Sequence, residues 1–433
     1  MSLTNSSVLT ASWFKFAGGR IETLSALVFG VVGLMAILYS IARLRGRAGQ
    51  LVEFYVFSLV LLLSAIGVVF AHDLLLLFVF WELATVAVWR LIVYFRQGES
   101  VNAGTWAFYI NFAAATVMLV GLVLLQFETG SWDLDMLSGR EITLLPALLI
   151  LVGILAKSAT LPLYIWLPRA YRQAPISVCA LLSGVAENLG FILFLKLFVL
   201  TVRAGEAFYI ISAILAVVSS LIAGGVALNA RTIRETLAYS TVSQLGFVLL
   251  GFGVAGYYGL IGGLLYITAH AIAKAGLFFA TGVVEDVSGT GEFNNLGGFA
   301  RISPALAAAT AVLALSIMGI PPTLGFFAKV GVVIGAVQKN FLLGVGAIVA
   351  ALFTMLYISR LYARIFLGTG KDETGIEGTS TAAGHSINFG TGLVVVMALL
   401  TVVLGLMWFV PVRFLQGDAM IRLLSLSSFL GGM

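Results

Sequence analysis

The sequence has little charge, and this shortage excludes most soluble folds. Only 10% of its 433 residues are Asp, Glu, Lys or Arg, whereas 61% are hydrophobic, and the mean hydropathy is +1.09. A soluble domain carries about 25% charged and about 45–50% apolar residues. Since no soluble fold can bury this much apolar surface, we expect an integral membrane protein. The net charge of +5 comes from basic residues scattered between apolar runs, a pattern typical of membrane topology and not of nucleic-acid binding.

Cysteine and histidine are also scarce. The single cysteine, Cys179, excludes a disulfide framework and any zinc or iron–sulfur site built on cysteines. The three histidines, His72, His270 and His385, form no haem-binding pair and no ligand cluster in the sequence. The chain also has no Walker A motif and no dinucleotide-binding fingerprint after a strand. We therefore expect no metal, no cofactor and no redox chemistry in this chain.

Apolar runs long enough to cross a bilayer recur along the chain. A helical span needs about 20 mostly apolar residues, and every span should be helical because lipid offers an open strand no hydrogen-bond partner. The sequence thus predicts an all-α polytopic membrane protein of about 12 transmembrane helices, near residues 22–42, 54–71, 74–94, 105–126, 144–167, 176–200, 208–228, 237–253, 259–283, 304–338, 341–366 and 390–412.

The run 304–338 is too long for one straight helix and carries GIPPTLG in its middle. Basic residues decide between one crossing and two, because they concentrate in cytoplasmic loops. One interrupted crossing places these residues on a single face: Arg43, Arg45, Arg47, Arg96, Arg169, Arg172, Arg231, Arg234, Arg301, Arg360, Arg364 and Lys371. We therefore predict a cell (inner) membrane protein with cytoplasmic basic loops and both termini outside. The acidic loop FETGSWDLDMLSGRE also falls outside.

Two lysine-bearing segments are interrupted by proline, one in each half of the chain. Lys157 precedes Pro162, and Lys329 follows the two prolines of GIPPTLG. Such a pair of broken helices is typical of an inverted repeat with a site in each half, although prolines also simply kink membrane helices. We divide the chain into an N-terminal segment (1–21), which lacks the pattern of a cleavable signal peptide, a transmembrane bundle (22–412) and a C-terminal tail (413–433). The bundle would hold half-channels at about 54–200 and 208–366, and the polar stretch 368–389 reads as a flexible loop.

Four charges lie inside apolar runs. They are Glu82, Lys157, Lys274 and Lys329. Each costs about 2.5–3.5 kcal/mol at a helix centre, and such residues by default mark ion or proton routes. Lysine loses its proton readily when buried, unlike arginine, and this suits it to picking up and releasing protons. For Glu82, the alternative is a structural ion pair with Arg90.

Further polar residues sit near these charges. His270 and Lys274 are four residues apart and share a helix face, so they can pass a proton through water; a hydrogen-bonded core histidine is the alternative. Glu187 is another carboxylate in an apolar run, and its neighbour Asn188 suits close helix packing. Arg234 and Glu235 open a helix at the inner surface, where an interfacial ion pair and a functional role are equally plausible. His385 lies in the polar stretch and is assigned no role.

Five segments occur in an order that resembles the antiporter-like subunits of respiratory complex I. They are FVFWELATVAVW, ILAKSATLPLYIWLPRAYRQAPISVCALLSG, RETLAYSTVSQLGF, HAIAKAGLFF and GIPPTLGFFAK, and the resemblance covers about residues 54–366. The same family includes the large subunits of Mrp-type sodium/proton antiporters and the membrane arms of energy-converting hydrogenases. The resemblance implies that Glu82 and Lys157 form the first glutamate–lysine pair of a midplane row. His270 and Lys274 would be its central relay and Lys329 its terminal lysine.

The chain also departs from this pattern. Asn188, with Glu187 beside it, stands where the family usually has lysine or histidine; Arg90 stands where it has an apolar residue; and Arg234 stands where it often has lysine. The family commonly has about 14 core helices, two more than this chain shows. The link from Lys157 to the central relay would then use Glu187 or water, or be impaired.

The resemblance implies a proton- or sodium/proton-translocating subunit of a redox-driven membrane complex. Its partners would be other membrane-arm subunits, the lipid bilayer, protons and sodium, while redox cofactors sit on partner subunits. Two alternatives stay open. One is a self-contained cation/proton antiporter, and the other is a degenerate scaffold subunit that has lost conduction.

Overall fold

The computed structural model describes residues 9–11, 14–16, 18–44, 46, 48–368 and 381–415. Helices make up most of this part of the chain, and the few strands are two or three residues long. In chain order the elements are β1 (Leu9–Ala11), β2 (Phe14–Phe16), α1 (Arg20–Arg43), α2 (Ala48–Phe70), α3 (Leu74–Ile92), α4 (Gly98–Thr129), α5 (Leu134–Leu137), β3 (Glu141–Ile142), α6 (Leu144–Lys157), α7 (Trp166–Gln173), α8 (Ile176–Gly184), η1 (Ala186–Asn188), α9 (Leu189–Phe194), η2 (Leu195–Val199), β4 (Arg203–Ala204), α10 (Glu206–Asn229), α11 (Ile233–Gly253), α12 (Tyr257–Ser288), η3 (Phe293–Asn295), α13 (Phe299–Ile302), α14 (Pro304–Met318), α15 (Leu324–Lys339), α16 (Phe341–Phe366), α17 (Thr381–Leu406) and α18 (Phe409–Leu415).

The predicted class, an all-α polytopic membrane protein, is confirmed. Within the described residues, ten helices are long and apolar enough to cross a membrane, and α6 and α14 are shorter apolar helices. The short strands lie outside these helices: β1 pairs with β2 in antiparallel fashion, and β3 pairs with β4 in parallel. The long apolar helices satisfy their backbone hydrogen bonds internally, as a membrane interior requires.

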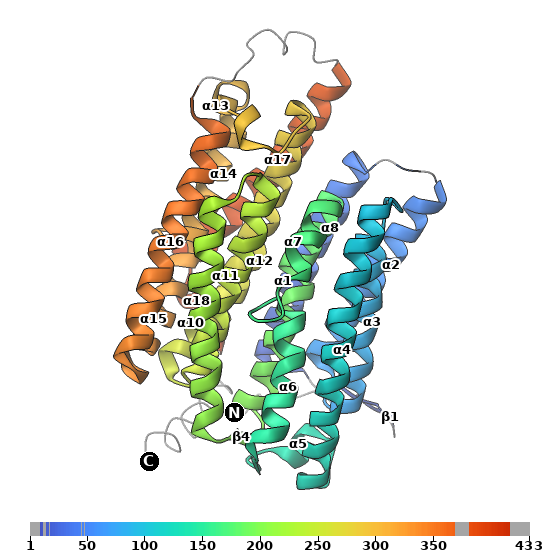
Figure 1. Cartoon of the computed structure of the whole chain (residues 1–433), viewed down its shortest axis with the longest axis vertical. Coiled ribbons are helices and arrows are strands. Elements are labelled where there is room, and N and C mark those ends of the chain that lie inside the picture. The colour runs from blue at the N-terminus through green and yellow to red at the C-terminus, as the bar shows by residue number, and fades with distance from the viewer. Residues whose placement is uncertain are drawn as a thin grey trace.

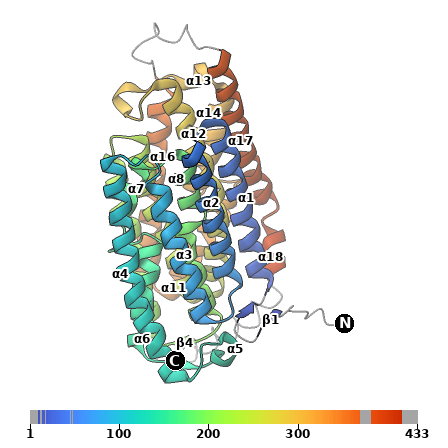
Figure 2. The ribbon, with the colours of Figure 1, turned by 90° about the vertical axis from the view of Figure 1, so that its right-hand side faces the viewer.

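The helices run side by side along the long axis of the molecule (Figure 1), and Figure 2 shows the same bundle from its edge. In the most apolar window of α12, every residue is buried, and in α11 94% are buried, whereas α4 and α16 bury only 39% and 33%. The exposed side chains of the outer helices are large and apolar, such as Leu59 and Leu352. An outer face of this composition fits a lipid surround. The inner helices α11 and α12 therefore provide a place where a polar row is shielded from lipid.

Close backbone approach sets α12 against α15. A Cβ added at Gly262 would meet the backbone of α15 at the Val332 nitrogen, 2.5 Å away, and one at Gly335 would meet the Gly259 nitrogen at the same distance. Small residues at a helix interface let membrane helices pack closely, because lipid supplies no hydrophobic force between them. This contact fixes the Lys329-bearing helix against the helix that carries His270 and Lys274.

Helical structure is interrupted at both proline-containing segments. The helix α6 ends at Lys157 and α7 begins at Trp166, and the Leu161–Pro162 peptide between them is cis. Similarly, α14 ends at Met318 and α15 begins at Leu324, with a cis Pro321–Pro322 peptide between them. Whether the two halves are related as an inverted repeat stays a prediction.

Residues 304–339 cross the bundle once. At one end, Arg231 after α10, Phe293 before α14 and Arg364 near the end of α16 line a common pocket. At the other end, Lys339 closes α15 and pairs with Glu206, the first residue of α10, at 2.8 Å. The pair α14–α15 therefore leads from the arginine-rich end of the bundle to the opposite end, with its interruption between.

The sequence prediction of a flexible loop over 368–389 is wrong for its last part. Residues 381–389 belong to α17, which extends a predicted span toward its N-terminus by more than two turns. Polarity alone misled the prediction, because a polar helix end that projects beyond an apolar core has the same composition as a loop. Residues 369–380 lie outside the described part of the chain, and so does the His385 side chain.

Candidate functional site

The ionisable residues that the sequence places in apolar runs are buried in the bundle. Glu187, His270 and Lys274 are each 0% exposed, while Lys157 is 3% and Lys329 5% exposed. Glu82 is half-buried. The five buried side chains do not reach the surface as a snorkelling side chain would, whereas Glu82 stays partly exposed. Each of the five must find its polar partners inside the protein.

Lys157 is held at the end of α6 by a turn of α3. Its Nζ donates to Thr85 Oγ1 at 2.5 Å and to the Trp81 carbonyl at 3.3 Å. The ammonium also lies 4.9 Å from the centroid of the Trp81 ring, a distance at which the ring quadrupole attracts a cation. The site accepts the lysine in both its charged and its neutral form, because none of these partners carries a full charge.

Glu82 lies beside this lysine but is not bonded to it. Among the described residues, the pair forms no salt bridge within 4.0 Å, and Glu82 Oε1 is buried without a hydrogen-bond partner. The two groups are nonetheless close enough for their charges to interact. The predicted pair, Glu82 and Lys157, is thus brought close together without a direct hydrogen bond or salt bridge.

The predicted alternative for Glu82, an ion pair with Arg90, is absent. The Arg90 side chain pairs with Glu53 on α2, and Arg96 pairs with the same carboxylate at 2.6 Å. The helical position explains this result, since Arg90 is two turns beyond Glu82 and faces α2. Arg90 therefore joins α2 to α3, and its contacts leave Glu82 unconstrained.

Glu187 and Asn188 occupy the 3₁₀ turn η1 that separates α8 from α9. Glu187 Oε1 accepts a hydrogen bond from the Tyr171 hydroxyl at 2.6 Å, and Oε2 has no partner among the described residues. Its charge interacts with that of Lys274. Asn188 donates to the Ser183 and Gly184 carbonyls, at 3.1 Å each, which α8 leaves free where it ends. Asn188 therefore stabilises the break, while Glu187 faces the central lysine.

The centre of the row lies on α12. Lys274 Nζ donates to Ser240 Oγ at 2.7 Å and to the Leu237 carbonyl at 3.1 Å. His270, one turn earlier, has both ring nitrogens buried without a partner among the described residues. It is close enough to Lys274 and Lys329 for the charges of both to act on it. Because neither ring nitrogen has a partner among the described residues, the alternative of a hydrogen-bonded core histidine does not hold for this structure.

Lys329 lies just after the second interruption. Its Nζ donates to the Ile317 carbonyl at 2.7 Å, which α14 leaves free near its end. The ammonium lies 4.6 Å from the Phe247 ring centroid and 5.6 Å from that of Tyr266. Gly319, with φ +78°, lets the chain turn here, and a Cβ at this position would lie 2.8 Å from Lys329 Cδ. Both broken helices therefore seat a lysine by carbonyl and ring contacts without a carboxylate partner.

A network of uncharged side chains joins the centre of the row to its far end. Ser240 contacts the Tyr357 hydroxyl at 3.3 Å, Gln244 Nε2 donates to the same hydroxyl, and the Tyr266 hydroxyl donates to Gln244 Oε1. This network begins at Lys274, which contacts Ser240, and it ends at Tyr266, whose ring lies beside Lys329. Ser240 and Gln244 belong to the motif YSTVSQLGF, but their residue types gave no reason to predict a role for them.

Several buried polar atoms along the row have no partner in the described part of the chain. Besides those of Glu82, Glu187 and His270, they include Ser158 Oγ, Ser183 Oγ, Asn188 Oδ1, Thr310 Oγ1 and Ser316 Oγ. Buried polar groups are nearly always hydrogen-bonded to protein or to ordered water. Such groups therefore need partners beyond the described side chains, and ordered water is their usual source.

Arg234 is fixed as part of an ion pair. Its guanidinium contacts Glu285 Oε2 from Nη2 at 2.7 Å and Glu285 Oε1 from Nε at 2.8 Å. Nη1 donates to the Ala174 carbonyl at 2.8 Å. The interfacial ion pair expected near Arg234 is present, with Glu285 as its partner and not the adjacent Glu235, which caps the start of α11.

One buried lysine was not predicted as a site residue. Lys196 lies in the π-helical turn η2, is 4% exposed, and its Nζ donates to the Val69 carbonyl at 2.6 Å and the Ala71 carbonyl at 2.5 Å. It thereby caps the C-terminal end of α2, where free carbonyls and the helix dipole favour a cation. The rule that found Lys157 also applies here, since Lys196 stands in the predicted span 176–200.

A second polar cluster lies outside the row. His72, Asp133 and Asp135 offer atoms within 4.8 Å of one another, a grouping that the sequence did not suggest. Lys15 Nζ donates to both carboxylates, at 2.9 Å and 2.5 Å, and His72 Nε2 contacts Asp135 Oδ1 at 2.8 Å. A lysine ammonium already satisfies these carboxylates, so this cluster is an ionic clasp between the N-terminal strand and α5.

Three comparisons relate this chain to known proteins. The family model described as NADH:quinone oxidoreductase/Mrp antiporter, TM, matches residues 71–354. NADH-quinone oxidoreductase subunit N of Desulforudis audaxviator is 32% identical over 367 residues, covering 81% of this chain and 71% of that protein. A Na(+)/H(+) antiporter component of Alkalihalophilus pseudofirmus is 30% identical over 387 residues, covering 82% of this chain. This chain spans about half (48%) of that longer relative.

The fold also matches a solved structure. A chain in the Mrp complex from Dietzia sp. DQ12-45-1b superimposes with a TM-score of 0.82 at 23% sequence identity. The match covers 96% of this chain and 84% of that chain. At this identity the likeness concerns the fold.

Proposed function

Because the chain belongs to the NADH:quinone oxidoreductase/Mrp antiporter transmembrane family, we propose that it is an ion-translocating subunit of a larger membrane complex. Protons, or sodium ions exchanged against protons, move along a row of buried side chains from Glu82 and Lys157 through Glu187, His270 and Lys274 to Lys329. Redox chemistry belongs to partner subunits. Relatives named as subunits, and a matching chain within an Mrp complex, support this assignment to an assembly.

One observation carries the proposal. Five titratable side chains are buried in the bundle and Glu82 is half-buried, and several of their polar atoms lack protein partners within the described residues. Keeping even one charge in a membrane interior costs several kcal/mol, and a purely structural role would pair each charge fully. Here Lys157, Lys274 and Lys329 have neutral partners, which hold either protonation state. This arrangement favours groups that change charge over groups that hold helices together.

The mechanism follows from electrostatics at short range. A proton on Lys157 is stabilised by an ionised Glu82 nearby and destabilised when Glu82 is protonated. The same relation holds between Glu187 and Lys274. His270 faces positive charge on two sides, so it accepts a proton only while Lys274 or Lys329 is neutral. A change of charge at one end of the row therefore shifts the proton occupancy of the next member.

The arginine-rich end of the bundle is proposed to face the cytoplasm. Arg231 lies between α10 and α11, and Arg43, Arg301, Arg360 and Arg364 lie near the ends of α1, α13 and α16. Cytoplasmic loops and the helix ends beside them are enriched in basic residues. The acidic clasp of Lys15, Asp133 and Asp135 then lies on the outer face.

The test replaces the two lysines at the broken helices. Lys157→Ala and Lys329→Ala are produced in the purified complex with its co-purifying subunits and reconstituted into liposomes. Proton uptake driven by a potassium diffusion potential is followed with a pH-sensitive dye. We expect both variants to lose uptake while retaining the wild-type subunit composition. Unchanged uptake in both variants would refute the mechanism.

A second candidate function, autonomous cation/proton antiport, is favoured by the identity to antiporter subunits. It requires that this chain alone exchanges ions. The purified chain, reconstituted without partners, should then take up sodium when a pH gradient is imposed. The proposal of a complex subunit instead expects no exchange from the isolated chain and full activity only when partner subunits co-purify.

A further inference from the structure

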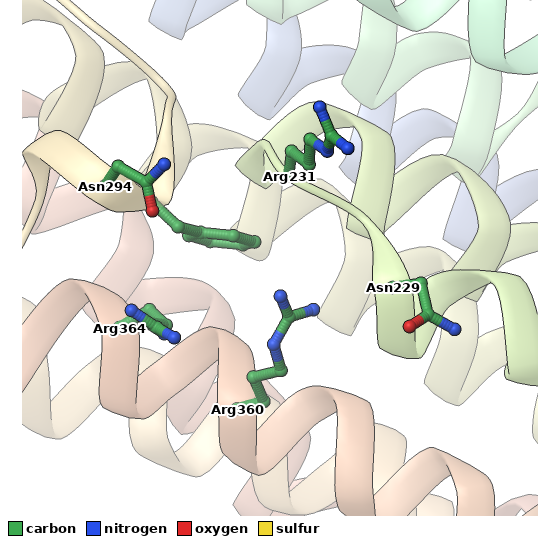
Figure 3. A pocket seen from close by; sticks show the side chains of 6 residues that line it. Asn229, Arg231, Asn294, Arg360 and Arg364 are labelled. Atoms are coloured by element: carbon green, nitrogen blue, oxygen red, sulfur yellow. The ribbon is translucent and has the colours of Figure 1, made fainter.

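A cavity of about 280 Å³ lies at the arginine-rich end of the bundle, apart from the buried row. Three elements enclose it: the turn between α10 and α11, the 3₁₀ turn η3, and the last turns of α16. Figure 3 shows Arg360 extending from α16 toward Arg231, with Asn229 and Asn294 on opposite sides. The lining residues are Asn229, Arg231, Phe293, Asn294, Arg360 and Arg364.

The lining carries three positive charges and no carboxylate. Arg360 is held in place, because its guanidinium donates to the Leu228 carbonyl and its Cζ lies 5.5 Å from the Phe293 ring centroid. Arg231 and Arg364 are exposed, and within the described residues their guanidinium groups have neither a hydrogen bond nor an ion pair. Three like charges around one cavity repel each other unless an anion lies between them.

Other arginines at the same end of the bundle have acidic partners. Arg43 pairs with Asp286, Arg234 with Glu285 and Arg96 with Glu53. A tendency to place basic residues at the cytoplasmic end explains how many arginines there are, but it does not explain why these three share a cavity without an acid. The contrast indicates that the counter-charge of the cavity comes from outside the described chain.

We infer that this cavity binds a phosphate group, presented by a phospholipid headgroup or by free phosphate. The planar guanidinium matches two phosphate oxygens at once, which lysine cannot do. The side-chain amides of Asn229 and Asn294 lie on either side, and that of Asn229 also donates to the Gly225 carbonyl at 3.2 Å. The cavity opens where membrane helices end, which is the depth of lipid headgroups. The Phe293 ring adds an aromatic surface to a lining that is otherwise polar.

Binding is tested on the purified full chain in neutral detergent. Thermal unfolding is measured while dioctanoyl phosphatidylglycerol or inorganic phosphate is titrated. The test variant is Arg231→Gln/Arg364→Gln, which leaves Arg360 and its carbonyl contact intact. The matched control is Arg172→Gln, an exposed arginine of the same end that does not line the cavity.

We expect phosphatidylglycerol to raise the unfolding temperature of the wild type and of Arg172→Gln with saturation. The double variant should need at least about tenfold more lipid for a half-maximal shift, because two charge-assisted contacts are lost. Should the double variant not fold, Arg364→Lys keeps the charge without the two-pronged geometry and should weaken binding by a smaller factor.

The two sources of phosphate separate in the same experiment. A saturable shift with inorganic phosphate that is lost in the double variant identifies free phosphate as sufficient. A shift with phosphatidylglycerol alone identifies the lipid. Equal shifts in the wild type, the control and the double variant, or an equal shift with uncharged dioctanoylglycerol, would overturn the assignment. Because binding and not ion flux is read, the result is independent of the proposed translocation.

Discussion

The two halves of the bundle hold their lysines by different means. In the second half, Lys274 starts a chain of direct contacts through Ser240, Tyr357 and Gln244 to Tyr266, whose ring lies beside Lys329. In the first half, Lys157 bonds only to α3, and the groups between it and Glu187 carry unpartnered atoms. In the second half, protein contacts thus link Lys274 to the ring beside Lys329, although His270, Thr310 and Ser316 also carry unpartnered atoms there. In the first half, no such network joins Lys157 to Glu187 among the described residues.

This difference separates two tasks. An amide such as that of Gln244 does not readily release and regain a proton, so the network of the second half is suited to fixing positions. Under the proposed function, His270 and water would carry the charge there. A path made of water can open and close when a nearby charge changes, since bridging waters cost little to order or displace. The first half is therefore the place where coupling to a partner subunit is expected to act.

The largest effect should come from removing titration at Lys157 while keeping its charge. Lys157→Arg preserves a cation near Trp81 but releases no proton near neutral pH. We expect proton uptake by proteoliposomes to fall about 100-fold, within the range that a positioned proton-transfer group contributes. Arg96→Lys, an exposed change in the same half, is the control. Wild-type uptake by Lys157→Arg would show that the site needs only a fixed charge.

A smaller effect should distinguish the second half, which has the protein network, from the first half, which lacks one. Gln244→Leu leaves the buried Tyr266 hydroxyl without its partner, at a cost of about 1–3 kcal/mol for the unsatisfied group. The Tyr357 hydroxyl loses one contact and keeps those to Ser240 and Thr354. We expect about tenfold slower uptake and a lower unfolding temperature. Ser158→Ala in the first half removes an atom that has no protein partner, so water can compensate and uptake should stay within about twofold. If the serine variant proves the slower one, the contrast between the halves is wrong.

A still smaller effect is expected at Arg90. Its partner is Glu53 and not Glu82, so Arg90→Gln should leave the charge balance of the row unchanged. Proton uptake should stay within about twofold of the wild type, and the unfolding temperature should fall slightly as the link between α2 and α3 weakens. A strong loss of uptake that Glu53→Gln does not reproduce would restore a direct influence of Arg90 on Glu82.

The sequence predicted the helical spans and most buried charges, because a charge in an apolar run stands out at any position. It did not predict which charged residues form ion pairs with each other. Arg90 lies nearer in sequence to Glu82 than to Glu53, and Arg234 is adjacent to Glu235, yet packing of separate helices selects Glu53 and Glu285. Partner choice across a bundle depends on rotation and tilt of each helix, which local sequence does not specify.

Uncharged polar residues left no usable signal. Serine, glutamine and tyrosine occur throughout membrane helices. The sequence therefore did not single out Ser240 and Gln244 on α11 or Tyr357 on α16, which contact each other only in the folded bundle. Lys196 is different, since its charge was readable in the span 176–200. The sequence did not predict the π-helical turn that directs the Lys196 side chain toward the end of α2.

The smallest effect concerns the ionic clasp at the opposite end from the arginine cavity. Burial raises the pKa of Asp135, but hydrogen bonds from Lys15 and His72 outweigh it and hold the pKa below its ordinary value of 3.8. Burial lowers the pKa of Lys15, but its two carboxylate partners outweigh it and raise the pKa above 10.5. The clasp thus contributes stability between these limits. The contribution is lost as the pH falls through the folded-state pKa of Asp135, or rises through that of Lys15.

Asp135→Asn tests the clasp. Asp135 is largely exposed, so the unfolding temperature at pH 7 should fall by no more than about 2 °C. Below about pH 3.8 the difference from the wild type should shrink, because the wild-type carboxylate is then protonated as well. Proton uptake should match the wild type, since the clasp lies outside the row of buried lysines. A variant that unfolds normally but fails to take up protons would show instead that the clasp takes part in proton entry at this end of the bundle.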